Sequence, residues 1–302
     1  MSLLELADIV IHMGKKHCEI LRTIERASYR FRYVPLQYIA RKMSIKPKVL
    51  ERMIDWLVKN KLLKKKQEDY IGYALTYKGA DALAIKEISN LGIITQVGPK
   101  IGMGKDGDIW VAYLNNKPRI IKLYRISPER FKHIRLHRYY ILPKRKLSWL
   151  DISKILARNE FRALSILYKQ GVNVPRPIVR NRHVIIMDYV PGRELIKTHL
   201  EDPIWVFERI VEELVKALKA GIVHADLSEF NILVTEEGEP YIIDWPQFVT
   251  SNHPEALSLL ERDILQISKY FSRKYKISIK DLIEIINKEL EKRNVELQIT
   301  LQ

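Results

Sequence analysis

The chain has 302 residues, enough for two or three domains, and its hydrophobic content of 47% is typical of a globular protein. No apolar run approaches the ~18 residues of a membrane span. Glu5 and Asp8 interrupt the apolar N-terminal stretch and argue against a signal peptide. Cys18 is the only cysteine, which excludes an internal disulfide and favours a reducing, cytoplasmic location.

The formal net charge of +16 is concentrated in two segments. Residues 1–90 hold 18 Lys/Arg against 10 Asp/Glu, and residues 125–146 hold eight against one. A solvated surface alone would explain a basic composition. Clustered charge instead favours a polyanionic partner, because each phosphate contact adds affinity through counterion release.

The first 90 residues predict a winged helix-turn-helix. Pro35 can begin a short helix, and Pro47 can begin a second one that runs through Lys59. "KLLKKK" and "YIGYALT" then predict two strands joined by an acidic turn, which completes the winged order. The second helix would carry basic residues on its polar side: Lys48, Arg52 and Lys59. A small stable domain without nucleic-acid binding remains the alternative.

The next segment, "GPKIGMGKDGDIWVAYL", fits the pattern G-x-G-x-x-G with Gly102, Gly104 and Gly107. A dinucleotide-binding fingerprint would need a helix after the glycines, but "DIWVAYL" is strand-like. Strand, glycines and strand are instead the context of a kinase loop that folds over ATP phosphates. Glycines in a tight hairpin would explain the pattern equally well.

A lysine and a glutamate at expected core positions form a candidate ion pair. Lys122 lies within the apolar strand "RIIKLY", where a buried ammonium group needs an anionic partner. Glu160 shares one helical face with leucines in "ILARNEFRALSILYKQG". Between them, residues 125–150 are basic and irregular and predict a flexible loop. Two later strands lead into an expected hinge between lobes.

The segment "HADLSEFNILV" has the spacing H-x-D-L-x-x-x-N of a phosphotransferase catalytic loop. Two strands flank the turn "EEGE", and residues whose numbers sum to about 475 should face each other, such as Leu233 with Ile242. Asn231 would then face Asp244, and an amide oxygen beside a carboxylate suits Mg²⁺. Asp226 can reach the same place, where it would orient or deprotonate the nucleophile. We expect His224 to brace this loop rather than to react, and a core histidine with satisfied hydrogen bonds is the alternative.

These motifs resemble the RIO family of atypical protein kinases, in its second, winged-helix subfamily. The resemblance rests on "LTYKGADALAIK", "IGMGKDGDIW", "NEFRAL", "HADLSEFNILV", "IIDWPQ" and "SNHPEALSLLERDI". It implies an α+β fold in which a winged helix-turn-helix (1–90) precedes a trimmed two-lobed kinase domain, with lobes at 91–190 and 191–302. It also implies Mg-ATP as cofactor, with Mn²⁺ as an alternative metal.

The resemblance also assigns the site residues. Asp226 and Asp244 would be catalytic, and Asn231 and Asp244 would hold the metal. Met187 would be the gatekeeper, with the backbone of Asp188 and Val190 facing the adenine. The full set of ATP-binding positions would be Ile101, Gly102, Met103, Gly104, Lys105, Gly107, Lys122, Glu160, Met187, Asp188 and Val190.

The family assists late maturation of the small ribosomal subunit, which implies precursor RNA as the partner of the basic surface. Trp-Pro follows Asp244 where protein kinases have Phe-Gly, Ser228 replaces a phosphate-contacting lysine, and the segment that docks peptide substrates is missing. We therefore expect ATP hydrolysis as a conformational switch. The alternatives are a protein kinase with other substrates or with autophosphorylation, whose candidates are Ser127, Ser148 and Ser153. A small-molecule phosphotransferase and a DNA-binding regulator with an inactive kinase domain are less favoured.

Overall fold

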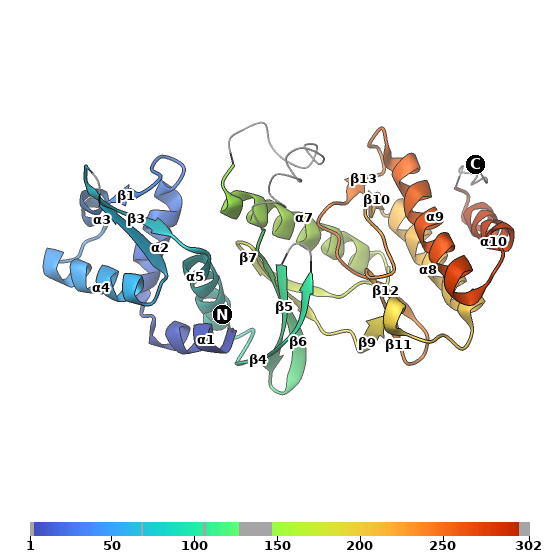
Figure 1. Ribbon diagram of the computed structural model, residues 1–302, viewed down its shortest axis with the longest axis horizontal. Helices are drawn as coiled ribbons and strands as arrows, with labels where there is room; N and C mark the ends of the chain where they lie inside the picture. The colour runs from blue at the N-terminus through green and yellow to red at the C-terminus, as the bar shows by residue number, and fades with distance from the viewer. Residues whose placement is uncertain (1–2, 68, 105–106, 127–146, 296–302) are drawn as a thin grey trace. The chain divides into compact units, whose positions relative to one another are not determined.

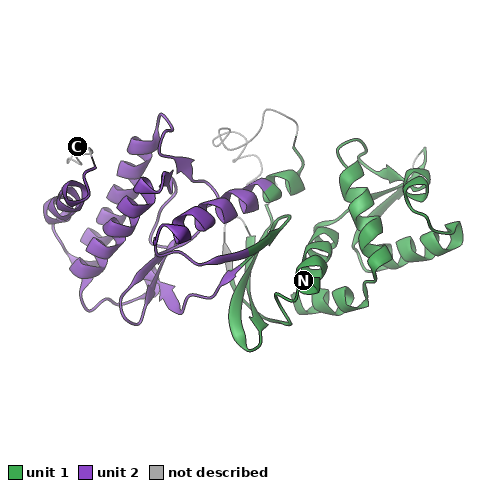
Figure 2. Cartoon of the chain, turned by 180° about the vertical axis from the view of Figure 1, so that it is seen from behind, with its two compact units in different colours: residues 1–154, 179–186 green, residues 155–178, 187–302 purple. Residues whose placement is uncertain are grey.

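The structure is a computed structural model that describes residues 3–67, 69–104, 107–126 and 147–295. It divides into two compact units (Figure 2). Unit 1 comprises residues 1–154 and 179–186, and unit 2 comprises residues 155–178 and 187–302. Because unit 1 contains both the first 90 residues and the sheet that follows, the boundary near residue 90 stays a prediction. Within the described ranges, no helix combines the length and apolarity of a membrane span.

Within the first 90 residues, the predicted order of helix, turn, helix and β-hairpin follows two N-terminal helices and a short strand (Figure 1). The helices are α1 (Leu3–His12), α2 (Lys15–Ala27), α3 (Leu36–Lys42), α4 (Pro47–Lys59) and α5 (Tyr77–Asn90). A small antiparallel sheet has the order β1 (Val34–Pro35), β3 (Ile71–Leu75) and β2 (Leu63–Gln67). α4 has the predicted bounds, and its buried face carries Leu50, Ile54 and Leu57. The winged-helix prediction is confirmed.

The second part of unit 1 is a five-stranded sheet with the order β4-β5-β6-β8-β7. Its strands are β4 (Gln96–Gly104), β5 (Gly107–Leu114), β6 (Lys117–Tyr124), β7 (Pro177–Asn181) and β8 (Val184–Asp188), the last two of which extend into unit 2. β4, β5 and β6 form an antiparallel meander. Residues 127–146 of the predicted flexible loop lie outside the described residues.

Two groups of charged residues connect the N-terminal helices to this sheet within unit 1. Asp81 on α5 is fully buried and accepts hydrogen bonds from His183 Nε2 (2.7 Å) and from Arg125. Arg125 also pairs with Asp108 on β5 (2.6 Å). In the second group, Arg182 bonds to Glu25 and Glu87, which belong to α2 and α5. Removing one partner from such a buried network leaves an uncompensated charge, so residues 1–90 and the sheet depend on each other.

Unit 2 contains most of α7 (Trp149–Lys169), which begins in unit 1, and a helical core. Its other elements are β9 (Gly192–Glu194), η2 (Leu195–Lys197), α8 (Pro203–Lys219), β10 (Ile222–Val223), β11 (Ile232–Thr235), β12 (Pro240–Ile242), β13 (Val249–Thr250), α9 (Ala256–Tyr275) and α10 (Ile279–Lys292). Phe207 on α8 and Phe271 on α9 pack edge to face at 5.1 Å between ring centroids. This core supports the small sheet β12-β11-β9 and the loop before β11.

The predicted register of the β11–β12 hairpin is wrong by one residue. Leu233 pairs with Tyr241 rather than with Ile242, and Val234 pairs with Pro240. The turn is shorter than the expected "EEGE", because Thr235 N donates to Glu239 O (3.1 Å) and only residues 236–238 lie between them. Gly238 closes this three-residue turn with a φ of +84°, a left-handed conformation that suits glycine.

Candidate active site

The predicted glycine loop is a β-hairpin in unit 1. β4 ends at Gly104 and β5 begins at Gly107, and these two residues pair across the hairpin. Strands therefore flank the glycines on both sides, as a kinase loop requires. Lys105 lies outside the described residues. Ile101, just before the first glycine, is 51% exposed.

The fold leaves no room for a side chain at Gly107 but leaves room for one at Gly102. A Cβ at Gly107 would lie 2.0 Å from the backbone oxygen of Leu123 on β6, so packing of the sheet alone requires glycine there. A Cβ at Gly102 would meet only side-chain atoms of Ile109, at 3.7 Å or more. The fold thus explains Gly107 but not Gly102. Gly102 lacks a side chain although the fold leaves room for one, so a ligand could approach the backbone closely at this position.

Lys122 lies on the same face of this sheet as Gly102. Gly102 pairs with Ile109, and Ile109 pairs with Lys122, so the three residues form one row across β4, β5 and β6. Directly paired residues project to the same face of a sheet. Lys122 is only 8% exposed, and its ammonium group lies 5.1 Å from the ring centroid of Tyr124. The lysine is therefore buried on the glycine side, as predicted.

Glu160, the predicted partner of Lys122, belongs to unit 2 and is 1% exposed. Its Oε1 accepts a hydrogen bond from Trp245 N (3.3 Å), immediately after Asp244. Asn159, one residue earlier on α7, donates to Pro246 O (3.5 Å). α7 therefore fixes the chain that follows Asp244. The ion pair between Lys122 and Glu160 stays a prediction.

The predicted catalytic loop of unit 2 is held from both sides of Asp226. His224 is 2% exposed, and both of its ring nitrogens engage the backbone: Nδ1 accepts from Asp226 N (3.3 Å), and Nε2 donates to Ile243 O (3.1 Å). Its ring packs on Trp245 at 4.6 Å between centroids. These contacts agree with the predicted bracing role, because neither nitrogen is left for proton transfer.

Asp263 on α9 is a functional candidate that sequence reasoning missed. It is 1% exposed and accepts hydrogen bonds from Ala225 N (2.7 Å) and Leu227 N (3.2 Å), the two residues that flank Asp226. Ala225 has a φ of 65°, a left-handed conformation that costs about 1–2 kcal/mol in a non-glycine residue. Asp263 therefore stabilises a strained turn that determines where Asp226 points. Its place in "LLERDI" gave no signal, since a carboxylate on an amphipathic helix usually faces solvent.

Asn231 and Asp244 are in contact, as predicted, although they do not pair directly. Ile243 N donates to Asn231 O (2.9 Å), so Ile243 is the residue opposite Asn231. Asp244 follows with a φ of 69°, and this left-handed turn brings its carboxylate to Asn231, with 3.3 Å between Oδ2 and Nδ2. Ser228 donates to Asn231 Oδ1 (2.6 Å).

The pair offers oxygen ligands for a hard cation. To bind Mg²⁺, Asn231 would have to present its amide oxygen, rather than its nitrogen, beside Asp244. Rotating the amide by about 180° would do this and would place the nitrogen against Ser228 Oγ, which can accept a hydrogen bond. Among the described residues, no group of three or more His, Cys, Asp or Glu side chains is placed to hold a metal. Two protein oxygens suit Mg²⁺, which usually keeps waters and binds substrate phosphates as well. The residues therefore fit this ion.

Gln247, the last residue of the motif "IIDWPQ", is a second site residue whose role the sequence did not indicate. It is 4% exposed, and its Nε2 donates to Asp226 Oδ2 (3.1 Å). In the segment predicted to be the hinge, Met187 and Val190 are buried. Asp188 N donates to Arg176 O, and Val190 O accepts from Gly192 N, at 2.9 Å each.

The candidate autophosphorylation sites differ in access. Ser148 is exposed and caps α7, where its Oγ accepts from Asp151 N and donates to the Asp151 carboxylate. Ser153 is fully buried and bonds to Trp149 O, so it is not accessible in this fold. Ser127 lies outside the described residues.

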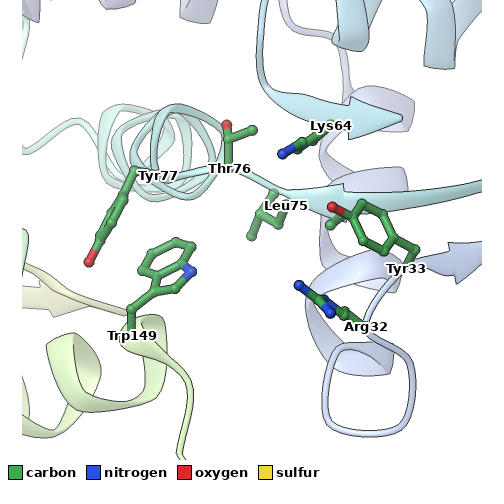
Figure 3. Close-up of a pocket in the computed structure, with 8 residues that line it drawn as sticks. Arg32, Tyr33, Lys64, Leu75, Thr76, Tyr77 and Trp149 are labelled. Carbon is green, nitrogen blue, oxygen red and sulfur yellow. The ribbon is translucent and has the colours of Figure 1, made fainter. Parts of the chain in front are cut away.

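A pocket of about 320 Å³ in unit 1 combines positive charge with aromatic rings (Figure 3). Arg32 and Lys64 place their cationic ends on one side, and Tyr77 and Trp149 place their rings on the other, 3.6 Å apart between centroids. Burial raises the pKa of Tyr77, and its hydroxyl donates to Ile126 O (3.0 Å). Cations that contact phosphates and rings that stack on bases are the usual surface for single-stranded nucleic acid.

Comparisons with known proteins match both parts of the chain. The RIO domain family matches residues 108–282, and the family "Rio2, N-terminal" matches residues 10–90. A RIO-type serine/threonine-protein kinase Rio2 from Methanocaldococcus jannaschii is 38% identical over 262 residues, which cover 82% of this chain and 93% of that protein. A serine/threonine-protein kinase rio2 from Dictyostelium discoideum is 34% identical over 87% of this chain, but this chain spans only 51% of that protein.

A solved structure agrees with the fold. It is the Rio2 kinase-ADP/Mg²⁺-phosphoaspartate complex from Chaetomium thermophilum, which aligns with a TM-score of 0.76 and 27% identity over 94% of this chain and 92% of that one. The resemblance noted from the motifs is confirmed, as is the fold class. The chain belongs to the RIO family of serine/threonine protein kinases, in the branch that carries the Rio2 N-terminal domain.

Proposed function

We propose that this protein binds Mg-ATP and mainly hydrolyses it, with Asp226, Asn231 and Asp244 as the central residues of unit 2. The observation that carries the proposal is the contact between Asn231 and Asp244, on a segment that hydrogen bonds fix beside Asp226. A bound Mg²⁺ would neutralise charge on the transferred phosphate. Unit 1 supports the assignment with buried Lys122 in the row that contains Gly102.

The hinge backbone supports adenine recognition. The amide of Asp188 and the carbonyl of Val190 already bond within unit 2. Recognition of an adenine edge would therefore use the other backbone group of each residue, namely the carbonyl of Asp188 and the amide of Val190. One acceptor and one donor match the amino group and the ring nitrogen that adenine presents.

Hydrolysis is favoured over transfer to other proteins because little chain is available for docking a peptide. α9 begins at Ala256, only nine positions after Gln247. Two routes reach free phosphate. Asp226 can orient water for direct attack, or Asp244 can attack first and form an aspartyl-phosphate that water then cleaves. The phosphoaspartate named in the Chaetomium thermophilum complex supports the second route. Transfer to protein hydroxyls is the alternative, and Ser148 is its exposed candidate.

The test combines binding and turnover in wild type and in Lys122→Ala. Calorimetry should detect Mg-ATP binding by the wild type and a loss of affinity of about tenfold or more in the variant, because a charge-assisted phosphate contact is removed. Phosphate release should fall in parallel while the melting temperature stays close to that of wild type. Unchanged affinity together with unchanged turnover would reject the role of Lys122.

We further propose that unit 1 binds RNA of the small-ribosomal-subunit precursor. The exposed basic side of α4 (Lys48, Arg52 and Lys59) and the pocket of Arg32 and Lys64 carry this second function. Deleting residues 1–90 would be a poor test, because Asp81 and Glu87 would be lost from buried networks. Point variants avoid that damage.

Filter binding as a function of salt measures this interaction. The double variant Arg32→Glu/Lys64→Glu should lower RNA affinity and reduce the salt slope by about 1.4, which is about 0.7 for each lost contact to a single-strand phosphate. Lys288→Glu, an exposed change of the same kind on α10, is the matched control and should bind as wild type does. Binding that does not depend on salt would contradict the proposal.

A further inference from the structure

Gln247 carries a buried hydrogen-bond acceptor that nothing in the described residues satisfies. Its side chain is 4% exposed, and Oε1 has no hydrogen-bond partner among them. Leaving such an atom unpaired costs about 1–3 kcal/mol. An unsatisfied buried acceptor beside a catalytic carboxylate is therefore expected to serve a donor that arrives with the reaction.

The orientation of this amide is determined by Asp226. Nε2 donates to Asp226 Oδ2 at 3.1 Å. Turning the amide would place its oxygen against a carboxylate oxygen, which is also an acceptor, and would leave an NH₂ group buried. The oxygen of the same amide therefore lies next to Asp226 but does not bond to it.

The segment that carries Gln247 is fixed in place. Glu160 accepts from Trp245 N, and Asn159 donates to Pro246 O. The Trp245 ring is fully buried and donates through Nε1 to Ile242 O (3.0 Å). A side chain on such a support is preorganised, as positioning of a reactant requires.

Two neighbouring acceptors match a nucleophile with two O–H bonds. Water can donate one proton to Asp226 and the other to Gln247 Oε1. A serine, threonine or other alcohol hydroxyl has a single proton, which Asp226 takes, and its carbon substituent would face the buried amide oxygen. The two acceptors thus favour water over an alcohol, because only water has two O–H groups to donate.

We propose that Gln247 positions the attacking water and thereby selects hydrolysis over transfer to hydroxyl groups. This inference rests on the proposed function. In the direct route, the water oxygen bonds to the γ-phosphorus, one water proton passes to Asp226, and the bond from the γ-phosphorus to the bridging oxygen breaks. ADP leaves with that electron pair. In the covalent route, the same water attacks the phosphorus held on Asp244, and the carboxylate is the leaving group.

The experiment measures which nucleophile receives the phosphate. Wild type, Gln247→Met and Gln247→Asn are incubated with Mg-ATP in water containing methanol, and inorganic phosphate and methyl phosphate are both quantified. Methionine has similar length but no amide, whereas asparagine keeps the amide and withdraws it by one methylene. Gln266→Met makes the same change at an exposed position of α9 and is the control. Gln247→Asn provides a second variant for the same measurement if Gln247→Met does not fold.

Phosphate release by Gln247→Met should fall by about 10- to 100-fold, the cost of a poorly positioned reactant. Methyl phosphate should fall less, so the ratio of methyl phosphate to phosphate rises in both Gln247 variants and stays at the wild-type value in Gln266→Met. A merely structural role would lower both products equally, and an unchanged ratio in the folded variants overturns the inference. If the wild type itself releases no phosphate, the proposed function fails first.

Discussion

Removing the Asp263 carboxylate should loosen the catalytic loop without touching any residue that contacts ATP. Asp263→Ala deletes hydrogen bonds to Ala225 N and Leu227 N, at 2.7 and 3.2 Å. Each bond to a charged acceptor contributes about 1.5–3 kcal/mol. The loss of both bonds should therefore be about 3–6 kcal/mol, and Ala225 can then relax from its left-handed conformation. The Asp226 carboxylate is then no longer held in its orientation.

Thermal unfolding and phosphate release together test this reasoning. A loss of about 3–6 kcal/mol corresponds to a fall of about 10 °C in melting temperature, and turnover should fall about 100-fold. Asp202→Ala is the control: it removes an exposed cap from α8, whose carboxylate accepts a hydrogen bond from Trp205 N, and it should cost about 1 kcal/mol. The reasoning is refuted if Asp263→Ala is no less stable than Asp202→Ala and retains wild-type turnover.

Three further predictions concern pH, glycine and phosphorylation. Burial alone would raise the pKa of Glu87, but hydrogen bonds from two arginines and an asparagine outweigh it and lower the pKa from 4.5 to about 2. Ionised Glu87 therefore contributes about 2 kcal/mol to the free energy of unfolding, a value discounted for its partial exposure. This contribution is present above pH 4.5 and is lost as the pH falls towards 2. Chemical denaturation across that pH range should detect the loss, and Glu87→Gln should remove the pH dependence. Gly107→Ala should lower the melting temperature because its Cβ meets the β6 backbone, whereas Gly102→Ala should fold normally and weaken Mg-ATP binding; equal melting temperatures would contradict the distinction. Mass spectrometry after incubation with ATP should find any phosphate at Ser148 rather than at buried Ser153, and the reverse result would mean that α7 opens.

Local signals predicted those parts of the fold that local chemistry determines. The two proline starts placed α3 and α4 correctly, because the fixed φ angle of proline acts within a few residues. The hairpin register failed because it depends on whether Gly238 takes a left-handed φ, which the sequence "EEGE" permits but does not require. The contact of Asn231 with Asp244 nevertheless held, since a second left-handed residue compensated for the shift.

Contacts between side chains that lie far apart in the sequence could not be predicted from the sequence. Asp81 and His183 are 102 positions apart, and each side chain alone looks like an ordinary surface residue. Asp263 and Gln247 are in the same situation: their roles come from buried contacts with the loop around Asp226. The motif residues were predictable because phosphoryl transfer constrains their spacing, whereas their supports are constrained only by the folded structure.

The fate of the γ-phosphate tests the central claim most directly. Wild type, Asp226→Asn and Asp244→Asn are given γ-labelled Mg-ATP, and free phosphate, hydroxylamine-labile protein label and hydroxylamine-resistant label are measured together. The account predicts that free phosphate greatly exceeds protein label in the wild type and that Asp226→Asn slows release. In the covalent route, Asp226→Asn also accumulates hydroxylamine-labile label, which Asp244→Asn cannot form. Stoichiometric, hydroxylamine-resistant labelling of a protein with little free phosphate would contradict it and identify transfer to hydroxyl groups as the reaction.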